Sequence, residues 1–192
     1  YRACTAGILR HQPQTIVGRL WFVDVYLERG RRITWEPDEL SSFYGGLIAQ
    51  GGAVREGAAY TRSWADVQKR FGVLPEGYDA ATGKVLSATN SLRPELADAA
   101  LNLWLLDRGE EWRMIARDHF LAMKRWSKAR YGYADLADVT ASPKVQSDHC
   151  PGYWWSEQMK YYYLIFADTP RVDYRKLYLS TEGNVLRGLR RR

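Results

Sequence analysis

The chain has 192 residues, 46% of them apolar and 26% charged, which suits one globular domain with a substantial core and excludes an intrinsically disordered protein. Four C-terminal arginines account for most of the formal charge of +6, and the remaining basic residues are interleaved with acidic ones, so nucleic-acid binding is not expected. No run approaches the roughly 20 apolar residues that span a bilayer, and the first residues lack a secretory-signal pattern, so this segment is expected to contain neither feature.

The first 35 residues predict the end of a helix followed by a β-hairpin. Thr5, Ile8 and Leu9 fall on one side of a helix, and the chain begins as though in mid-domain, so an upstream segment is expected. Bulky and smaller residues alternate over 21–26 (WFVDVY), a turn sequence follows at 28–31, and 32–35 is again extended in pattern. We therefore expect these two extended runs to pair.

Apolar residues spaced three and four apart predict that the rest of the chain is mainly helical. The strongest amphipathic stripe covers 92–106, where Asn90 or Ser91 could cap the helix and Pro94 fits its first turn. The other predicted helices cover 40–48 before Gly51, 64–71 before Gly72, 112–126 with a break at Gly132, and 155–166 before Pro170; a loop over 75–89 and an extended segment over 177–180 complete the chain.

Helices that follow one another through short or moderate loops predict an all-α fold, which could be a bundle, a solenoid or a closed toroid. No fixed-period repeat is present, which argues against a solenoid. No linker divides the chain, so residues 1–192 are expected to have no internal domain boundary. Eight Trp and thirteen Tyr suit a protein that stacks sugar rings, although core packing is the simpler explanation for any single one.

The segment Leu-Arg-Pro-Glu at 92–95 is the first candidate for chemistry. Proline and an acid are ordinary residues at a helix start, where the helix dipole favours negative charge. A carboxylate beside a guanidinium can also be held ionised and aimed into a cavity as a general base. These residues therefore predict a site that includes Arg93 and Glu95.

Two further segments place acids beside possible sugar or metal contacts. Tyr153 and Glu157 are four residues apart, so they share a helix face and could offer a stacking ring and an acceptor for hydroxyls; a capping or solvated glutamate is the alternative. Thr181 and Glu182 could bind a hard cation such as calcium through hydroxyl, carbonyl and water oxygens, although these two residues alone are a weak signal.

The cysteines and histidines carry little information. Cys4 and Cys150 could form a bridge, remain free thiols, or each pair with a cysteine outside this sequence. His11, His119 and His149 lack the spacing of zinc ligands, so no zinc site is expected.

Several ordered motifs together resemble the C-terminal region of glycoside hydrolase family 47, the class I α-1,2-mannosidases. The V-D-V run and L-P-E-G-Y are most similar to the branch of ER degradation-enhancing α-mannosidase-like proteins. The motifs are WFVDVY at 21–26, DELSSFYGG at 38–46, GVLPEGYD at 72–79, LRPEL at 92–96, RYGYADLADVT at 130–140, SEQMKYYYLIF at 156–166 and STEGN at 180–184.

The resemblance implies that the chain is the C-terminal half of an (α/α)7 barrel with a small β-hairpin. It implies Ca²⁺-dependent hydrolysis of terminal α-1,2-linked mannose from high-mannose N-glycans, with inversion, in glycoprotein quality control and ER-associated degradation. The expected location is the endoplasmic reticulum or secretory pathway, and a protein disulfide isomerase is a possible partner. The residues carried over are Glu95 as general base, Arg93, Tyr153, Glu157 and Glu182 around the substrate, and Thr181 as calcium ligand.

The sequence also departs from the family pattern. The motif that supplies the general acid and the Gly-Asp-Ser motif are absent, so the segment alone is expected to be inactive. Gly45 replaces a proline, Glu39 a histidine and Asn184 a histidine, and DHCPG at 148–152 replaces Asp-Arg-Met-Glu-Ser. A non-catalytic, calcium-dependent glycan-binding module is therefore the alternative function, and an unrelated helical scaffold for protein partners is a third.

Overall fold

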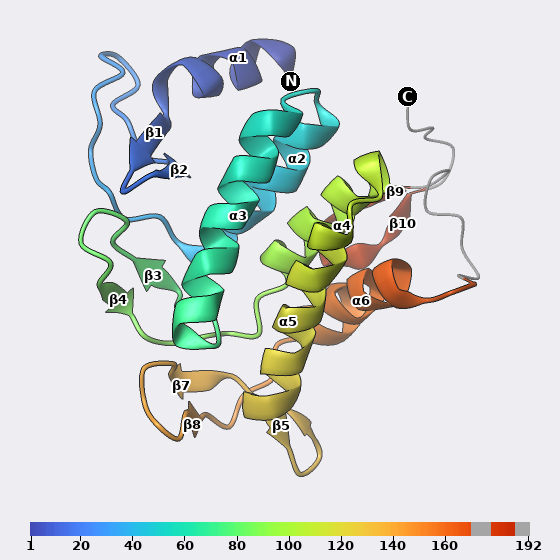
Figure 1. Ribbon diagram of the computed structural model, residues 1–192. Helices are drawn as coiled ribbons and strands as arrows, with labels where there is room; N and C mark the ends of the chain where they lie inside the picture. Colours follow the sequence, from blue (N-terminus) through green and yellow to red (C-terminus); the bar gives the residue numbers. More distant parts are fainter. Residues whose placement is uncertain (170–177, 187–192) are drawn as a thin grey trace.

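The computed structural model describes residues 1–169 and 178–186, and these form a mainly helical structure (Figure 1). Helices α3, α4 and α5 lie at its centre, and the short strand pairs lie toward its ends and sides. The helical elements are α1 (Arg2–His11), the 3-10 helix η1 (Glu39–Phe43), α2 (Tyr44–Gln50), α3 (Val54–Phe71), α4 (Glu95–Asp107), α5 (Glu110–Trp126), the π-helical turn η2 (Trp154–Gln158), α6 (Met159–Phe166) and the 3-10 turn η4 (Thr181–Gly183).

The described strands form two-stranded antiparallel pairs. The pairs are β1 (Pro13–Ile16) with β2 (Arg19–Phe22), β3 (Gly77–Tyr78) with β4 (Val85–Ser87), β5 (Lys128–Ala129) with β6 (Gly132–Tyr133), β7 (Leu136–Asp138) with β8 (Val145–Gln146), and β9 (Tyr178–Leu179) with β10 (Val185–Leu186). These pairs are too short to make a sheet layer, so the predicted all-α class is confirmed.

The predicted hairpin is confirmed only in part. The runs over 21–26 and 32–35 pair through one antiparallel bridge, Val25 with Arg32, flanked by two backbone hydrogen bonds of 2.8 and 2.7 Å. The regular hairpin lies earlier in the chain and is β1–β2. The hairpin turns at Val17 and Gly18, with φ of 49° and 72°. Left-handed conformations at both turn residues are typical of a type I′ two-residue hairpin, but valine is an unusual residue there, so the sequence carries no clear turn signal.

Helix α2 packs closely against α3 and α4 because glycines line its contacts. A Cβ on Gly57 of α3 would overlap the carbonyl oxygen of Gly45, and a Cβ on Gly46 would lie 2.8 Å from the Cα of Ala99 on α4. Gly45 therefore lies at a backbone contact between two helices. Helices α2, α3 and α4 therefore form one tightly packed unit, and the start of α4 belongs to it.

Some predicted helix boundaries are confirmed and others are wrong. Helix α3 ends at Gly72, whose φ of 78° is left-handed as expected for a glycine after a helix. Helix α5 ends at Trp126 rather than near Gly132, because the β5–β6 turn occupies the intervening residues. Residue 177 of the predicted extended tail lies outside the described residues, and Tyr178 and Leu179 form β9 as predicted.

Much of the aromatic content belongs to the core. Trp21 lies edge-on to Tyr60 and Trp64, with ring centroids 6.2 and 5.2 Å apart, and all three side chains are buried. A second buried cluster surrounds Trp154 between α5, α6 and the β6–β7 region. The surplus of Trp and Tyr is thus explained largely by packing.

Cys4 and Cys150 are both exposed and form no bridge with each other. Cys4 lies on α1, and Cys150 follows β8 at the opposite end of the molecule in Figure 1. Among the described helices, none is both long and apolar enough to cross a membrane.

Candidate active site

The site is built on the turn 90–94, which leads into α4. Asn90 exchanges two backbone hydrogen bonds with Leu136, at 2.9 and 2.8 Å. Leu92 then adopts a φ of 56°, a left-handed conformation that is costly for a bulky residue. Its amide donates to Oδ1 of Asn90 at 3.1 Å. Helix α4 starts at Glu95, three residues later than predicted, and neither Asn90 nor Ser91 caps it.

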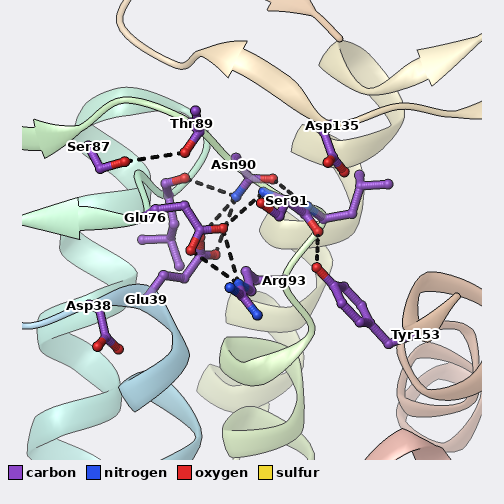
Figure 2. Close-up of polar contacts among 12 residues, drawn as sticks. Asp38, Glu39, Glu76, Ser87, Thr89, Asn90, Ser91, Arg93, Asp135 and Tyr153 are labelled. Atoms are coloured by element: carbon purple, nitrogen blue, oxygen red, sulfur yellow. Dashed lines mark hydrogen bonds and ion pairs between the residues drawn. The ribbon is translucent and has the colours of Figure 1, made fainter. Parts of the chain in front are cut away.

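Both sides of Ser91 are tied to other parts of the site. Its backbone N–H donates to Oε1 of Glu76 at 3.1 Å, and its carbonyl oxygen accepts the hydroxyl of Tyr153 at 2.6 Å. Figure 2 shows these contacts, which connect the segment before β3, the turn and the residue before η2. Hydrogen bonds with Leu136, Glu76 and Tyr153 therefore fix the backbone of the turn, and with it the direction of the side chains that follow.

Arg93 is held by Glu76. Its Nε donates to both carboxylate oxygens, at 3.1 and 3.2 Å, and the two side chains are 26% and 17% exposed. The guanidinium carbon lies 5.9 Å from the centre of the Tyr153 ring. Burial opposes the charge of Arg93, but the hydrogen bond and charge of Glu76 raise the arginine's pKa above its usual value. Arg93 and Tyr153, both predicted from the sequence, are thus neighbours.

Glu95 lies close to Arg93, and one of its carboxyl oxygens has no hydrogen-bond partner among the described residues. This oxygen, Oε2, is buried. Burial raises the pKa of Glu95 to about 8; Arg93 acts in the opposite direction, and the charges of Glu157 and Glu76 add to the rise. A carboxyl group of this kind can take up or release a proton near neutral pH.

Glu157 approaches the site from η2. Its side chain is buried, and the hydroxyl of Tyr161 donates to its Oε2 at 2.8 Å. Burial raises the pKa of Glu157, the hydrogen bond from Tyr161 lowers it, and the nearby charge of Glu182 raises it. Glu157 and Glu182, which are 25 residues apart in sequence, are therefore brought together as predicted.

The approach of η4 to η2 depends on Gly183. A Cβ at this residue would overlap the carbonyl oxygen of Ser156 and lie 2.9 Å from the Cα of Glu157, and its φ is 67°. Lys160 donates from Nζ to the Gly183 carbonyl at 2.6 Å, and Ser156 donates to Glu182 at 3.4 Å. These contacts fix the Thr-Glu-Gly turn beside Glu157.

The described residues do not themselves form a metal cage. No group of three His, Cys, Asp or Glu side chains among them is arranged to hold an ion. The backbone of Thr181 begins η4, but its side chain lies outside what the structure describes.

The sequence analysis missed three contributors to the site. Glu76 lies in the quoted motif GVLPEGYD but was not identified as the partner of Arg93. Asn90 was considered only as a helix cap. Asp135, labelled in Figure 2, adjoins the Asn90–Leu136 pairing and accepts a 2.7 Å contact from Nδ1 of His149. Glu76 and Asp135 both lie in motifs that resemble the family, but their partners are distant in sequence, so nothing local predicted their contacts.

The site combines carboxyl groups, one arginine and an aromatic ring at the starts of helices. This combination is typical of helical proteins that bind and cleave sugars. A sequence model of glycosyl hydrolase family 47 matches residues 1–188. The chain therefore belongs to glycosyl hydrolase family 47, a glycosidase family, and an unrelated helical scaffold is excluded.

Named relatives and a solved structure agree with this assignment. The chain is 29% identical to α-mannosidase I MNS4 of Arabidopsis thaliana over 176 residues, covering 86% of this chain and 28% of the relative. It is 26% identical to human ER degradation-enhancing α-mannosidase-like protein 2, covering 78% and 26%. The α-1,2-mannosidase from Trichoderma reesei superposes with a TM-score of 0.80 at 20% identity, covering 96% of this chain and 45% of that one.

The structural match confirms that the fold is part of an (α/α)7 barrel. The chain spans less than half of that solved protein and less than a third of these sequence relatives. Its assignment to the C-terminal half rests on the order of the motifs alone and stays a prediction.

Proposed function

We propose that the protein containing this chain removes terminal α-1,2-linked mannose from high-mannose N-glycans by inverting hydrolysis, with Glu95 as general base. The observation that carries this proposal is the buried, unsatisfied Oε2 of Glu95 in a family 47 fold, beside Arg93 and Glu157. A water or sugar hydroxyl placed there would meet an acceptor with no competing partner.

The neighbouring side chains have complementary roles in this proposal. Arg93 offers the guanidinium donors that Glu76 leaves open to sugar hydroxyls, and the ring of Tyr153 offers an apolar face. Glu157 and Glu182 accept from hydroxyls or bound water. An inverting glycosidase needs a second carboxyl roughly 6.5–9.5 Å from its base. We propose that this acid comes from outside residues 1–192, so that the segment alone is inactive.

We further propose calcium as the cofactor, held by Thr181 with waters bound to Glu157 and Glu182. The two carboxyl groups fit a cation, because the charge of Glu182 raises the pKa of Glu157, a cost that a nearby positive charge would offset, and hard cations prefer such oxygen ligands. Calcium supplies positive charge that orients sugar hydroxyls or water. Positive charge nearby would also lower the pKa of Glu95, which must be ionised to act as a base.

The biological setting is proposed from the relatives. One of them is named as an ER degradation-enhancing protein, and others as mannosyl-oligosaccharide α-1,2-mannosidases. We therefore propose the endoplasmic reticulum or secretory pathway as the location, and misfolded glycoproteins destined for ER-associated degradation as the glycan carriers. Pairing with a protein disulfide isomerase is part of the same proposal.

Substitution of Glu95 in the full polypeptide tests the mechanism. Glu95→Gln keeps the shape of the side chain but cannot accept a proton, so mannose release should fall by about 10² to 10⁴-fold while glycan binding is kept. Glu110→Gln is the matched control, because Glu110 also begins a helix but is exposed. If Glu95→Gln releases free mannose at the wild-type rate, Glu95 is not the general base.

One observation favours a second candidate, a calcium-dependent glycan-binding module without hydrolysis. With a pKa of about 8, Glu95 is largely protonated at neutral pH in this chain and is then a hydrogen-bond donor rather than a base. A full polypeptide that binds high-mannose glycan in calcium yet releases no mannose would support this candidate over the enzyme.

A further inference from the structure

Glu39 is the least expected side chain in the structure. It begins η1 and has no exposed surface, although a carboxyl group is among the side chains that are most costly to bury. The ionisable groups that face it are Glu76 from the segment before β3, Glu95 from α4 and Arg93 from the turn before α4. On its own element and on α3, Asp38 and Tyr60 are both engaged with Ser41, at 2.9 and 2.7 Å.

The backbone N–H of Glu39 donates to the carbonyl oxygen of Glu76 at 3.0 Å, whereas its side-chain hydrogen bonds lead to Asn90. Nδ2 of Asn90 donates to its two carboxyl oxygens at 3.1 and 3.4 Å, and also to the carbonyl oxygen of Leu74 at 2.9 Å. Oδ1 of the same Asn90 accepts the amide of Leu92, whose φ is 56°. Figure 2 shows Glu39 and Asn90 at the centre of the site. Glu39 and the Leu74 carbonyl oxygen therefore hold the Asn90 amide together, and through Oδ1 of Asn90 they support the strained turn.

The surroundings of Glu39 do not suit a negative charge. The nearest cation, Arg93, forms its ion pair with Glu76, and in the described part of the chain no lysine or arginine pairs with Glu39. A buried carboxylate with a single amide donor and two acidic neighbours is costly. Burial first, and then the charges of Glu76 and Glu95, raise the pKa of Glu39 well above its usual value.

We propose that Glu39 is a positioning residue that acts as an uncharged carboxylic acid: it holds the Asn90 amide and thereby the turn that aims Arg93 and Glu95. Its carbonyl oxygen accepts from Asn90, and its protonated oxygen avoids adding a negative charge to the site. The proposal has two consequences. The uncharged amide of glutamine can replace Glu39, whereas alanine leaves Asn90 without this acceptor.

Thermal unfolding of the full polypeptide tests whether Glu39 is uncharged, and the test does not depend on any enzymatic activity. Because the pKa of Glu39 is raised on folding, its stabilisation is complete below the ordinary glutamate pKa and is lost as pH rises through the raised value. Melting temperatures between about pH 5 and pH 9 should therefore fall more steeply in the wild type than in Glu39→Gln. Exposed Glu36→Gln, three residues away, should follow the wild type.

Alanine variants test the route through Asn90. Glu39→Ala and Asn90→Ala should each lower the melting temperature, and the double variant should lower it no further than Asn90→Ala alone, since both remove the same contact. Full additivity of the two effects would overturn the role of Asn90. A Glu39→Gln variant that melts as low as Glu39→Ala, or that keeps the wild-type pH slope, would overturn the uncharged role.

A second readout rests on the proposed mannosidase function. Glu39→Ala should lower kcat/KM for mannose release by about tenfold, and Glu39→Gln should restore it, because the amide again holds Asn90. Loss of activity in Glu39→Gln equal to that in Glu39→Ala would contradict positioning by an uncharged group. A wild type without mannosidase activity would refute the proposed function, while the melting series would still decide the role of Glu39.

Discussion

At the scale of single residues, the aim of Arg93 depends on the charge of Glu76. Glu76 contacts both Nε of Arg93 and the amide of Ser91, so one carboxylate fixes the side chain and the backbone before it. Hydrogen bonds to a charged partner are stronger than neutral ones. The guanidinium is thereby kept near the face of the Tyr153 ring, with its carbon 5.9 Å from the ring centre.

Replacing Glu76 should therefore weaken glycan binding. Glu76→Gln retains an acceptor for Ser91 but removes the negative charge opposite Arg93, and the expected loss of affinity is about tenfold. Titration calorimetry with a high-mannose glycan and the full polypeptide measures it. Exposed Glu28→Gln serves as the control. Equal affinities for Glu76→Gln and wild type would show that the ion pair does not organise the site.

The sequence drew attention to Arg93 and Glu95, whose proposed roles stay predictions, but not to the residues that hold them in place. Arg93 and Glu95 were identified because a short motif contains both. Glu39 and Asn90 are 51 residues apart, and their contact exists only once η1 packs against α4. Residue types and local spacing contain no signal for such a contact, so the sequence suggested a helix cap for Asn90 instead.

At the scale of elements, close helix packing depends on small residues more than on apolar ones. Gly57 of α3 faces the backbone of Gly45, and its absent side chain would also lie 2.9 Å from Cβ of Ala49. Because α2 follows η1 directly, the α2–α3 contact also determines where Glu39 lies. Displacement of α2 would therefore disturb the site as well as the core.

Adding one methyl group at this contact should destabilise the protein. Gly57→Ala forces α2 and α3 apart, at a cost of about 1–3 kcal/mol. Gly7→Ala on α1 is the control: nothing lies within 4 Å of its added Cβ, so the helix should gain about 0.5–1 kcal/mol. Urea unfolding of the full polypeptide compares the two. Equal stability of both variants would show that the glycine contact is not close-packed.

Element types were predictable where periodic patterns are long. Helix α5 was predicted over nearly its full length of 17 residues, whereas only 64–71 of the 18 residues of α3 were predicted. The regular hairpin was not predicted, because its turn uses Val17 in a conformation that favours glycine or asparagine. The start of α4 was placed too early, because the apolar spacing begins at Leu92, which packs in the core from outside the helix.

At the scale of the whole molecule, the chain is part of a larger barrel. It matches 45% of the solved α-1,2-mannosidase, so helices that complete a barrel of that kind are absent from this segment. An inverting glycosidase uses two carboxyl groups around one sugar, and under the proposed function this chain supplies the base. Family membership follows from the sequence match, whereas the source of the acid stays part of the proposal.

The most direct test is the release of free mannose from a high-mannose N-glycan by the full polypeptide, with calcium and after chelation, beside the 1–192 segment. The expected result is release by the full polypeptide in calcium, none after chelation, and none by the segment. Release that persists after chelation would contradict the calcium assignment, and release by the segment alone would contradict an acid supplied from elsewhere. If the full polypeptide releases no mannose in the presence of calcium, the proposed hydrolysis is wrong.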